Sequence, residues 1–154
     1  MSDQHESGTD SKTGGGALFC TVVTPEATVL ETSAQFVALP LADGEIGIAP
    51  GHSPLIGRLG YGQLRTVDGD KHTSLYIDGG FVEIVGNQIS VLTNRAVVVD
   101  KLDAAVLEEQ LRTSLARPAN TPELLAQRDR IQLQTRAQLR IARSGSTADS
   151  SAGH

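Results

Sequence analysis

The 154-residue sequence has no tryptophan, a single cysteine and no long apolar run, and each shortage excludes a class of protein. The lone thiol, Cys20, cannot form an internal disulfide, which fits a reducing compartment. Three Phe and two Tyr leave aliphatic side chains to build the core. The longest nearly unbroken apolar run, Phe36 to Ala42, is far shorter than the roughly 20 residues that cross a bilayer. The sequence therefore predicts a chain that does not span a membrane.

Both ends of the sequence also lack apolar side chains. Residues 1–16 and 144–154 are rich in Ser, Gly and Asp, and we expect disordered tails there, because neither could bury enough surface to offset the entropy of ordering. Residues 1–16 have neither the basic start nor the apolar stretch of a secretory signal, so export by that route is not expected.

Charge is distributed unevenly over a chain with net charge −5. Residues 17–100 carry four Lys/Arg against nine Asp/Glu, whereas residues 101–143 carry eight against five. An acidic body repels the phosphate backbone, so binding of nucleic acid is not expected. The basic segment needs a separate explanation.

Residues 17–100 have the pattern of an all-β domain. Short runs rich in Val, Ile, Leu and Thr alternate with turn residues such as Asp68-Gly69, Asp78-Gly79-Gly80 and Gly86-Asn87. No helix-length segment interrupts them, so we expect about 8–10 short antiparallel strands forming a β-sandwich or flattened barrel. The predicted strands are Leu18–Val23, Gln35–Leu39, Glu45–Ala49, Gly62–Val67, Thr73–Asp78, Gly80–Val85, Gln88–Thr93 and Arg95–Asp100.

Residues 101–143 have the pattern of two helices. Asp103 can cap a first helix, in which leucines recur every four residues from Leu107 to Leu115. Thr121 as cap with Pro122 at the first helical position begins a second, which can run to about Arg143. The short connection predicts an antiparallel helical hairpin, and the whole chain is then of the α+β class.

A one-sided basic stripe follows the second helix. At 100° per residue its four arginines fall within about 120° of one another. They are Arg128, Arg136, Arg140 and Arg143. The stripe could dock on the chain's own acidic body or on another protein; alternatively, the arginine stems merely cover apolar surface on a solvated face.

The residues that commonly carry out chemistry are not grouped in the sequence. There is no phosphate-binding lysine loop, and no histidine pairs with a Cys or His at metal-ligand spacing, so no metal site is expected. Cys20 is interpreted as a core residue. A hydrolase using His52, Ser53 and Asp78 is disfavoured, because adjacent side chains on an extended segment point to opposite faces. The residues themselves predict a binding or assembly module without catalytic groups.

One segment is specific enough to indicate a family. Residues 43–56, DGEIGIAPGHSPLI, closely resemble the D/E-G-E-x-G-I-x-P-G-H-x-P-L segment of the epsilon subunit of F-type ATP synthases, called delta in mitochondria. Other family features follow in the same order along residues 17–143: Thr24-Pro25, the segment GGFVEI at 79–84, the segment ISVLT at 89–93, and Leu102-Asp103.

The resemblance implies a non-catalytic rotor subunit of the central stalk. In that family the subunit links the gamma subunit to the c-ring of the membrane sector for proton-driven ATP synthesis. It implies contact with the c-ring or gamma for the residues that match the family segment, namely Gly44, Glu45, Pro50, Gly51 and His52. It also implies a peripheral location on the cytoplasmic face of a bacterial inner membrane.

The resemblance implies a second role for the helices. In bacterial members the hairpin can extend toward an acidic segment of the catalytic β subunit and inhibit ATP hydrolysis, and we assign that contact to the arginine stripe. Some members bind ATP through a Leu/Ile-Asp-x-x-Arg-Ala segment. Here Leu102 and Asp103 are present but Val106 replaces the arginine, so no cofactor is expected and ATP binding should be weak or absent.

Two other interpretations remain open at this point. A free-standing β-sandwich adaptor or ligand-binding protein could have a helical tail docked on its sheet. An enzyme, either a hydrolase at His52 or a nucleotide-dependent activity near Asp103, is the third interpretation.

Overall fold

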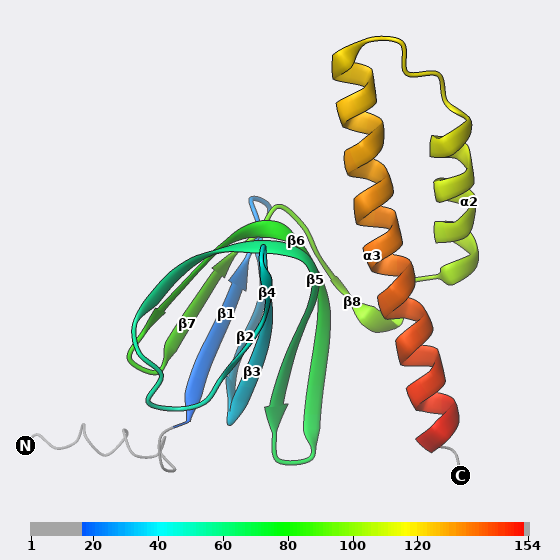
Figure 1. Ribbon diagram of the computed structural model, residues 1–154. Helices are drawn as coiled ribbons and strands as arrows, with labels where there is room; N and C mark the ends of the chain where they lie inside the picture. The colour runs from blue at the N-terminus through cyan, green and yellow to red at the C-terminus, as the bar shows by residue number, and fades with distance from the viewer. Residues whose placement is uncertain (1–16, 153–154) are drawn as a thin grey trace, which may run out of the picture.

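The computed structural model describes residues 17–152, and the side chains of residues 17–144 (Figure 1). Eight strands precede a 3-10 helix, η1 (Val99–Lys101), and two α-helices, α2 (Ala104–Ala116) and α3 (Pro122–Ala152). The strands are β1 (Leu18–Val23), β2 (Thr28–Ala34), β3 (Phe36–Leu41), β4 (Gly44–Ile48), β5 (Leu55–Asp68), β6 (Lys71–Val85), β7 (Gln88–Leu92) and β8 (Ala96–Val98). The predicted tail at 1–16 and residues 153–154 lie outside the described residues.

The strands form one hydrogen-bonded sheet that folds over on itself. Its order is β2-β1-β7-β6-β5-β3-β4, with β8 also paired to β6. The long β5–β6 hairpin takes part in both layers of the resulting sandwich. The first half of β5 and the second half of β6 continue the β2-β1-β7 layer, whereas the other halves pair with β3 and β8. The fold class predicted from the sequence, a β-sandwich followed by a two-helix hairpin, is confirmed.

The core between the two layers is aliphatic, as the shortage of aromatics required. It consists of inward-facing residues from β1–β7, alternating with outward-facing ones along each strand. Cys20 is fully buried among them, and burial raises the pKa of its thiol to about 12. The thiol is therefore a core group.

Several details of the strand prediction were wrong: residues 55–61 of β5 were not predicted as strand, and the predicted strand Arg95–Asp100 ends at Val98, where η1 follows. β1 pairs with β7 in parallel, so the sheet is not entirely antiparallel. β2 was not predicted, because the edge strand TVLETSA has no clear apolar alternation. The predicted reversal at Asp78-Gly79-Gly80 does not exist: β6 continues through it, and the glycines mark the bend at which the hairpin passes from one layer to the other.

Gly80 is required at that bend. Its φ is +111°, a region that L side chains rarely adopt, and a Cβ built there would lie 1.9 Å from the carbonyl oxygen of Leu92. The end of β7 thus crosses directly over the bend, which brings residues 92–94 beside Asp78.

The helix starts follow the sequence signals. The Asp103 carboxylate accepts hydrogen bonds from the backbone N–H groups of Ala105 and Val106, and the Thr121 hydroxyl accepts one from Leu124. The end of α3 does not follow them. The helix continues to Ala152, through residues for which a disordered tail from residue 144 was expected. None of the helices in the described part of the chain is long and apolar enough to cross a bilayer.

Candidate functional site

The predicted ring-contact residues lie at two ends of β4. Gly44 and Glu45 begin the strand, whereas Pro50, Gly51 and His52 belong to the loop that follows it. The Glu45 carboxylate pairs with the guanidinium of Arg65 on β5 at 3.2 Å, and both side chains are about half exposed. All five predicted residues lie at least partly at the surface, where another subunit could reach them.

The loop after β4 is held by a long-range hydrogen bond. The backbone N–H of Gly51 donates to Oδ1 of Asn87, in the turn between β6 and β7, at 3.0 Å. His52 Nδ1 lies 2.7 Å from the carbonyl oxygen of Ser53, its own neighbour. Among the described residues no Ser hydroxyl or Asp carboxylate hydrogen-bonds to His52, and Asp78 contacts Tyr76 and Gln134 instead. The hydrolase arrangement is not assembled.

Exposed apolar side chains gather on the outer surface of the β2-β1-β7 layer, around the exposed Glu83 of β6, which pairs with Ile56. Ile56 is 78% exposed, Phe81 and Leu92 are each 57% exposed, and Val85 is 56% exposed. Because Phe81 pairs with Leu92 and neighbours Arg58 across the ladder, these residues share one face of the sheet. We call Ile56, Phe81, Val85 and Leu92 the open face. Exposed apolar side chains gathered in this way are typical of an interaction surface.

The second half of the β5–β6 hairpin carries α3 on its outer side. Tyr76 on β6 is fully buried against Ala137 and Ile141 of α3, with Tyr61 at the edge of the contact. α2 packs mainly on α3. The outer side of this hairpin is thus exposed at the end that contains Ile56 and Phe81, and α3 covers it at the end that contains Tyr76 (Figure 1).

Polar groups complete the contact between α3 and the sandwich. Nε2 of Gln134 donates to both carboxylate oxygens of Asp78, at 2.9 and 3.2 Å, and the Tyr76 hydroxyl donates to Oδ1 at 2.9 Å. Burial, reinforced by the negative charge of Asp78, raises the pKa of Tyr76, which keeps the phenol protonated as a donor. We call Tyr76, Asp78 and Gln134 the junction triad; it holds the hairpin in its folded position.

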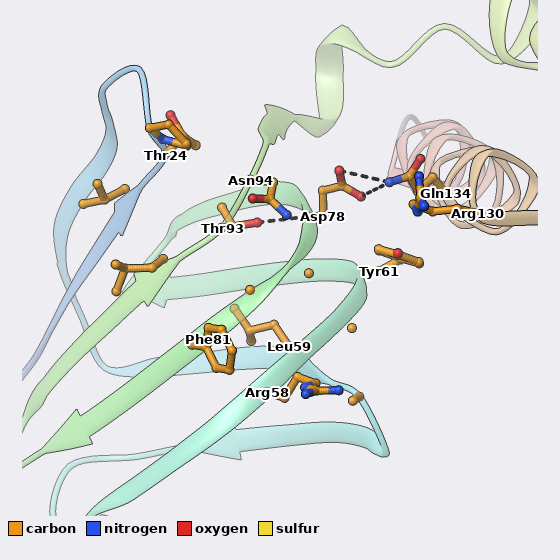
Figure 2. Close-up of a pocket in the computed structure, with 17 residues that line it drawn as sticks. Thr24, Arg58, Leu59, Tyr61, Asp78, Phe81, Thr93, Asn94, Arg130 and Gln134 are labelled. Carbon is orange, nitrogen blue, oxygen red and sulfur yellow. Dashed lines mark hydrogen bonds between the residues drawn. The ribbon is translucent and has the colours of Figure 1, made fainter. Parts of the chain in front are cut away.

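A cavity of about 870 Å³ lies where the open face meets α3 (Figure 2). One wall is the β5–β6 bend and the end of β7, and α3 provides Arg130 and Gln134. Arg58, Tyr61, Phe81 and Leu92 line it from the sandwich. The cavity therefore joins an apolar surface to two guanidinium groups.

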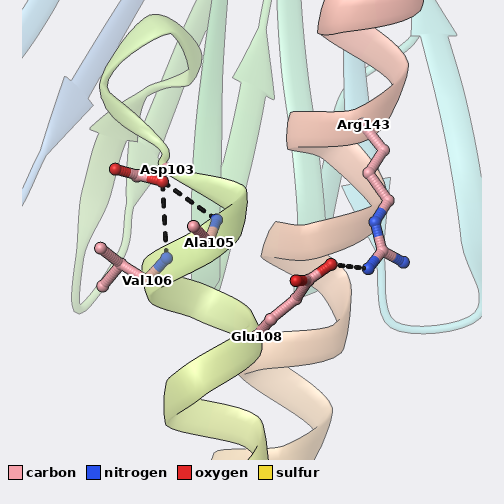
Figure 3. Close-up of polar contacts among 5 residues, drawn as sticks. All are labelled: Asp103, Ala105, Val106, Glu108 and Arg143. Carbon is pink, nitrogen blue, oxygen red and sulfur yellow. Dashed lines mark hydrogen bonds and ion pairs between the residues drawn. The ribbon is translucent and has the colours of Figure 1, made fainter.

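The arginine stripe is divided between two environments. Arg136 and Arg140 are exposed. Arg143 pairs with Glu108 of α2 at 2.5 Å, as Figure 3 shows beside the Asp103 cap, and Arg128 donates to the carbonyl oxygen of Arg117 at 3.4 Å. Two of the four predicted residues thus also brace α2 against α3.

Sequence reasoning missed the junction triad. Asp78 was assigned to a turn, and on the second helix only the arginine stripe was singled out. The face that packs on the sandwich uses Gln134, Ala137 and Ile141. Their i, i+3, i+7 spacing was the available signal, but small and polar side chains do not stand out in a search for leucine periodicity.

Two kinds of site were considered among the described residues, a metal site and the ATP motif at the start of α2. No group of three or more His, Cys, Asp or Glu side chains among them could hold a metal ion. Asp103, in the incomplete ATP motif, accepts from backbone amides as a helix cap, and Val106 beside it offers no charge.

Comparison with known proteins gives the family. Residues 17–99 match the model for the β-sandwich domain of the ATP synthase delta/epsilon chain. The ATP synthase epsilon chain of Rhodopirellula baltica is 45% identical over 129 residues, which cover 82% of this chain and 99% of that one. This chain belongs to the delta/epsilon family of ATP synthase subunits.

Other epsilon chains and solved structures agree. The epsilon chain of Desulfitobacterium hafniense strain Y51 is 36% identical over 84% of this chain and 92% of its own length. A chain in the structure of the Euglena gracilis mitochondrial ATP synthase has the same fold, with a TM-score of 0.66 at 20% identity, over 86% of this chain and 81% of that one. Since the similarity to epsilon chains includes the helices, a free-standing adaptor is not favoured.

Proposed function

We propose that this chain is a non-catalytic rotor subunit of an F-type ATP synthase, linking the gamma subunit to the c-ring and able to inhibit ATP hydrolysis through its C-terminal helices. Its similarity to epsilon chains over almost their whole length carries the proposal. The chain would then act as a peripheral subunit on the cytoplasmic face of a bacterial inner membrane, contributing contacts and no reacting groups.

The gamma subunit is assigned to the open face. A phenylalanine side chain has roughly 200 Å² of surface, so covering the exposed 57% of Phe81 removes on the order of 110 Å² from water and contributes about 3 kcal/mol. Leu92 and Ile56 add to this area. Burial of a few such side chains contributes several kcal/mol to the free energy of binding gamma.

The test is binding of full-length chain to its cognate gamma subunit. Phe81→Glu should weaken the complex on the order of 100-fold, because it removes the apolar contact and places a charge in the interface. Leu115→Glu is the matched control, since Leu115 is 51% exposed but lies on α2, away from the open face. If the wild-type chain binds no gamma, the proposed function fails.

The ring contact is assigned to Gly44, Glu45, Pro50, Gly51 and His52. Glu45→Ala with His52→Ala should reduce retention of the chain on membranes carrying the c-ring without weakening its binding to gamma alone. Lys71→Ala, at the turn between β5 and β6, is the control. Equal retention of both variants would remove this assignment.

The inhibitory contact is assigned to Arg128, Arg136, Arg140 and Arg143. Reversing all four to Glu should relieve inhibition of hydrolysis by the assembled ATPase, but Arg128 and Arg143 also contact α2. Reversal of Arg136 and Arg140 alone separates the effects, because both are exposed. A chain ending at Asp100 gives the fully uninhibited rate for comparison. Hydrolysis that is unchanged by the double reversal would contradict the assignment.

A further inference from the structure

The cavity beside the open face is lined by two parts of the chain, the sandwich and the helix α3, which were assigned different contacts above. Most of its lining comes from the sandwich, whereas Arg130 and Gln134 come from α3. Anything that occupies the cavity therefore touches both the sandwich and the folded hairpin. In Figure 2 the side chains of Arg130 and Gln134 lie across the cavity from the β5–β6 strands.

Two positive charges border this cavity without an anionic partner. Arg58 and Arg130 are both exposed, and within the described residues neither forms a hydrogen bond or ion pair through its guanidinium. Asp78 is the one carboxylate among the lining residues; it accepts hydrogen bonds from the neutral side chains of Gln134 and Tyr76, so its charge offsets only one of the two guanidinium charges. The cavity is thus left with an excess of positive charge on a chain whose net charge is −5.

Apolar surface runs from the open face into the cavity. Phe81 and Leu92 belong to both, and they lie in one row across the sheet with Arg58, since Arg58 pairs with Phe81 and Phe81 with Leu92. An occupant that matches this lining carries an apolar side chain for Phe81 and Leu92 and carboxylates for Arg58 and Arg130. A neutral ligand would leave both guanidinium groups unpaired, and nucleic acid would meet an acidic sandwich.

We propose that the cavity receives an acidic segment of the gamma subunit, with an apolar side chain on Phe81 and Leu92 and carboxylates paired to Arg58 and Arg130. This inference rests on the proposed function and adds to it a second, charge-dependent contact beyond the open face. Because α3 supplies one of the two arginines, the binding site for this segment is complete only when the hairpin is folded against the sandwich.

Coupling between gamma binding and the hairpin follows by linkage. A ligand that binds one of two conformations better shifts the equilibrium toward that conformation, and the reverse effect has the same size. Occupation of the cavity by gamma therefore stabilises the folded hairpin, and extension of the hairpin weakens this part of the gamma contact.

The experiment measures binding of the full-length chain to its cognate gamma subunit as ionic strength is varied. Arg58→Glu and Arg130→Glu should each weaken binding roughly tenfold at low salt, and both should flatten the salt dependence. Lys71→Glu makes the same charge change at the far turn of the β5–β6 hairpin and should leave binding unchanged. Arg58→Gln and Arg130→Gln, which add no negative charge, should show smaller losses in the same direction.

Hydrogen exchange of α3 gives the second readout. Gamma should slow exchange of the backbone amides near Gln134 in the wild-type chain, and this added protection should be lost in Arg130→Glu and retained in Lys71→Glu.

Gamma binding by the wild type that is unaffected by either arginine reversal would overturn the cavity contact while leaving the proposed function standing. Affinity losses without any change in the exchange of α3 would overturn the coupling to the hairpin. Absence of gamma binding by the wild type would refute the proposed function itself.

Discussion

Replacement of Gln134 by Leu should release the helical hairpin from the sandwich. The change removes the amide that donates to both oxygens of Asp78 and leaves the carboxylate with only the Tyr76 hydroxyl from the junction triad. Gln and Leu have similar helix propensities, so α3 itself should remain helical. Any effect then reports on the contact with the sandwich.

The size of the effect follows from the character of that hydrogen bond. A hydrogen bond to a charged group contributes about 1.5–3 kcal/mol, and the partial exposure of Asp78 places this one near the lower end, at roughly 1–2 kcal/mol. Since 1.4 kcal/mol corresponds to a factor of ten, the opening equilibrium of the hairpin should rise about 5- to 30-fold.

Amide hydrogen exchange measures this equilibrium directly. The backbone amides of α3 around Ala137 and Ile141 should exchange faster by the same factor, whereas amides of β7 in the sandwich core should not change. Gln127→Leu is the matched control, because Gln127 is an exposed glutamine on the same helix. If the amides around Ala137 and Ile141 exchange at the same rate in the Gln134→Leu and Gln127→Leu variants, the junction triad does not hold the hairpin on the sandwich.

Three further substitutions and treatments test the fold. Gly80→Ala should lower stability by about 3 kcal/mol or more, seen as a fall in Tm, because it adds positive-φ strain and a Cβ 1.9 Å from the Leu92 carbonyl oxygen; an unchanged Tm would show that the bend is adaptable. Asp103→Ala should cost about 1 kcal/mol and reduce helicity, whereas Asp103→Asn should retain most of it, as circular dichroism can check. Cys20 should react with a thiol reagent only on unfolding; because its folded pKa is about 12 against an unfolded 9.0, stability should be independent of this group below pH 9 and fall as pH rises from 9 toward 12. A fast reaction of the native thiol at pH 8 would show that it is not buried.

The sequence predicted most of the fold because the signals for it are local. Apolar alternation in β7 and the caps at Asp103 and Thr121 depend on neighbouring residues alone, and all three were found. β2 was missed because its inward face has Thr32 between Leu30 and Ala34, so apolar alternation is weak in the sequence. The glycines at 79–80 were assigned to a turn because positive φ serves a bend within a strand as well as a reversal.

The candidate site was less predictable because it depends on contacts distant in sequence. Asp78 and Gln134 are separated by most of the second half of the chain, and neither residue type indicates a partner. The parallel pairing of β1 with β7 likewise depends on how the whole sheet closes. The family segment at 43–56 could be recognised, but recognition did not show that β4 separates Glu45 from His52.

The continuity of β5 and β6 through both layers has a mechanical consequence. In a sandwich of two separate sheets, a sideways force can shear one sheet over the other by disturbing side-chain packing alone. Here such a movement must also distort the backbone ladder of the hairpin that crosses the bend, from Leu55–Ile84 at one end to Asp68–Lys71 at the other. Shear between the two layers is therefore resisted by backbone hydrogen bonds of this ladder as well as by side-chain packing.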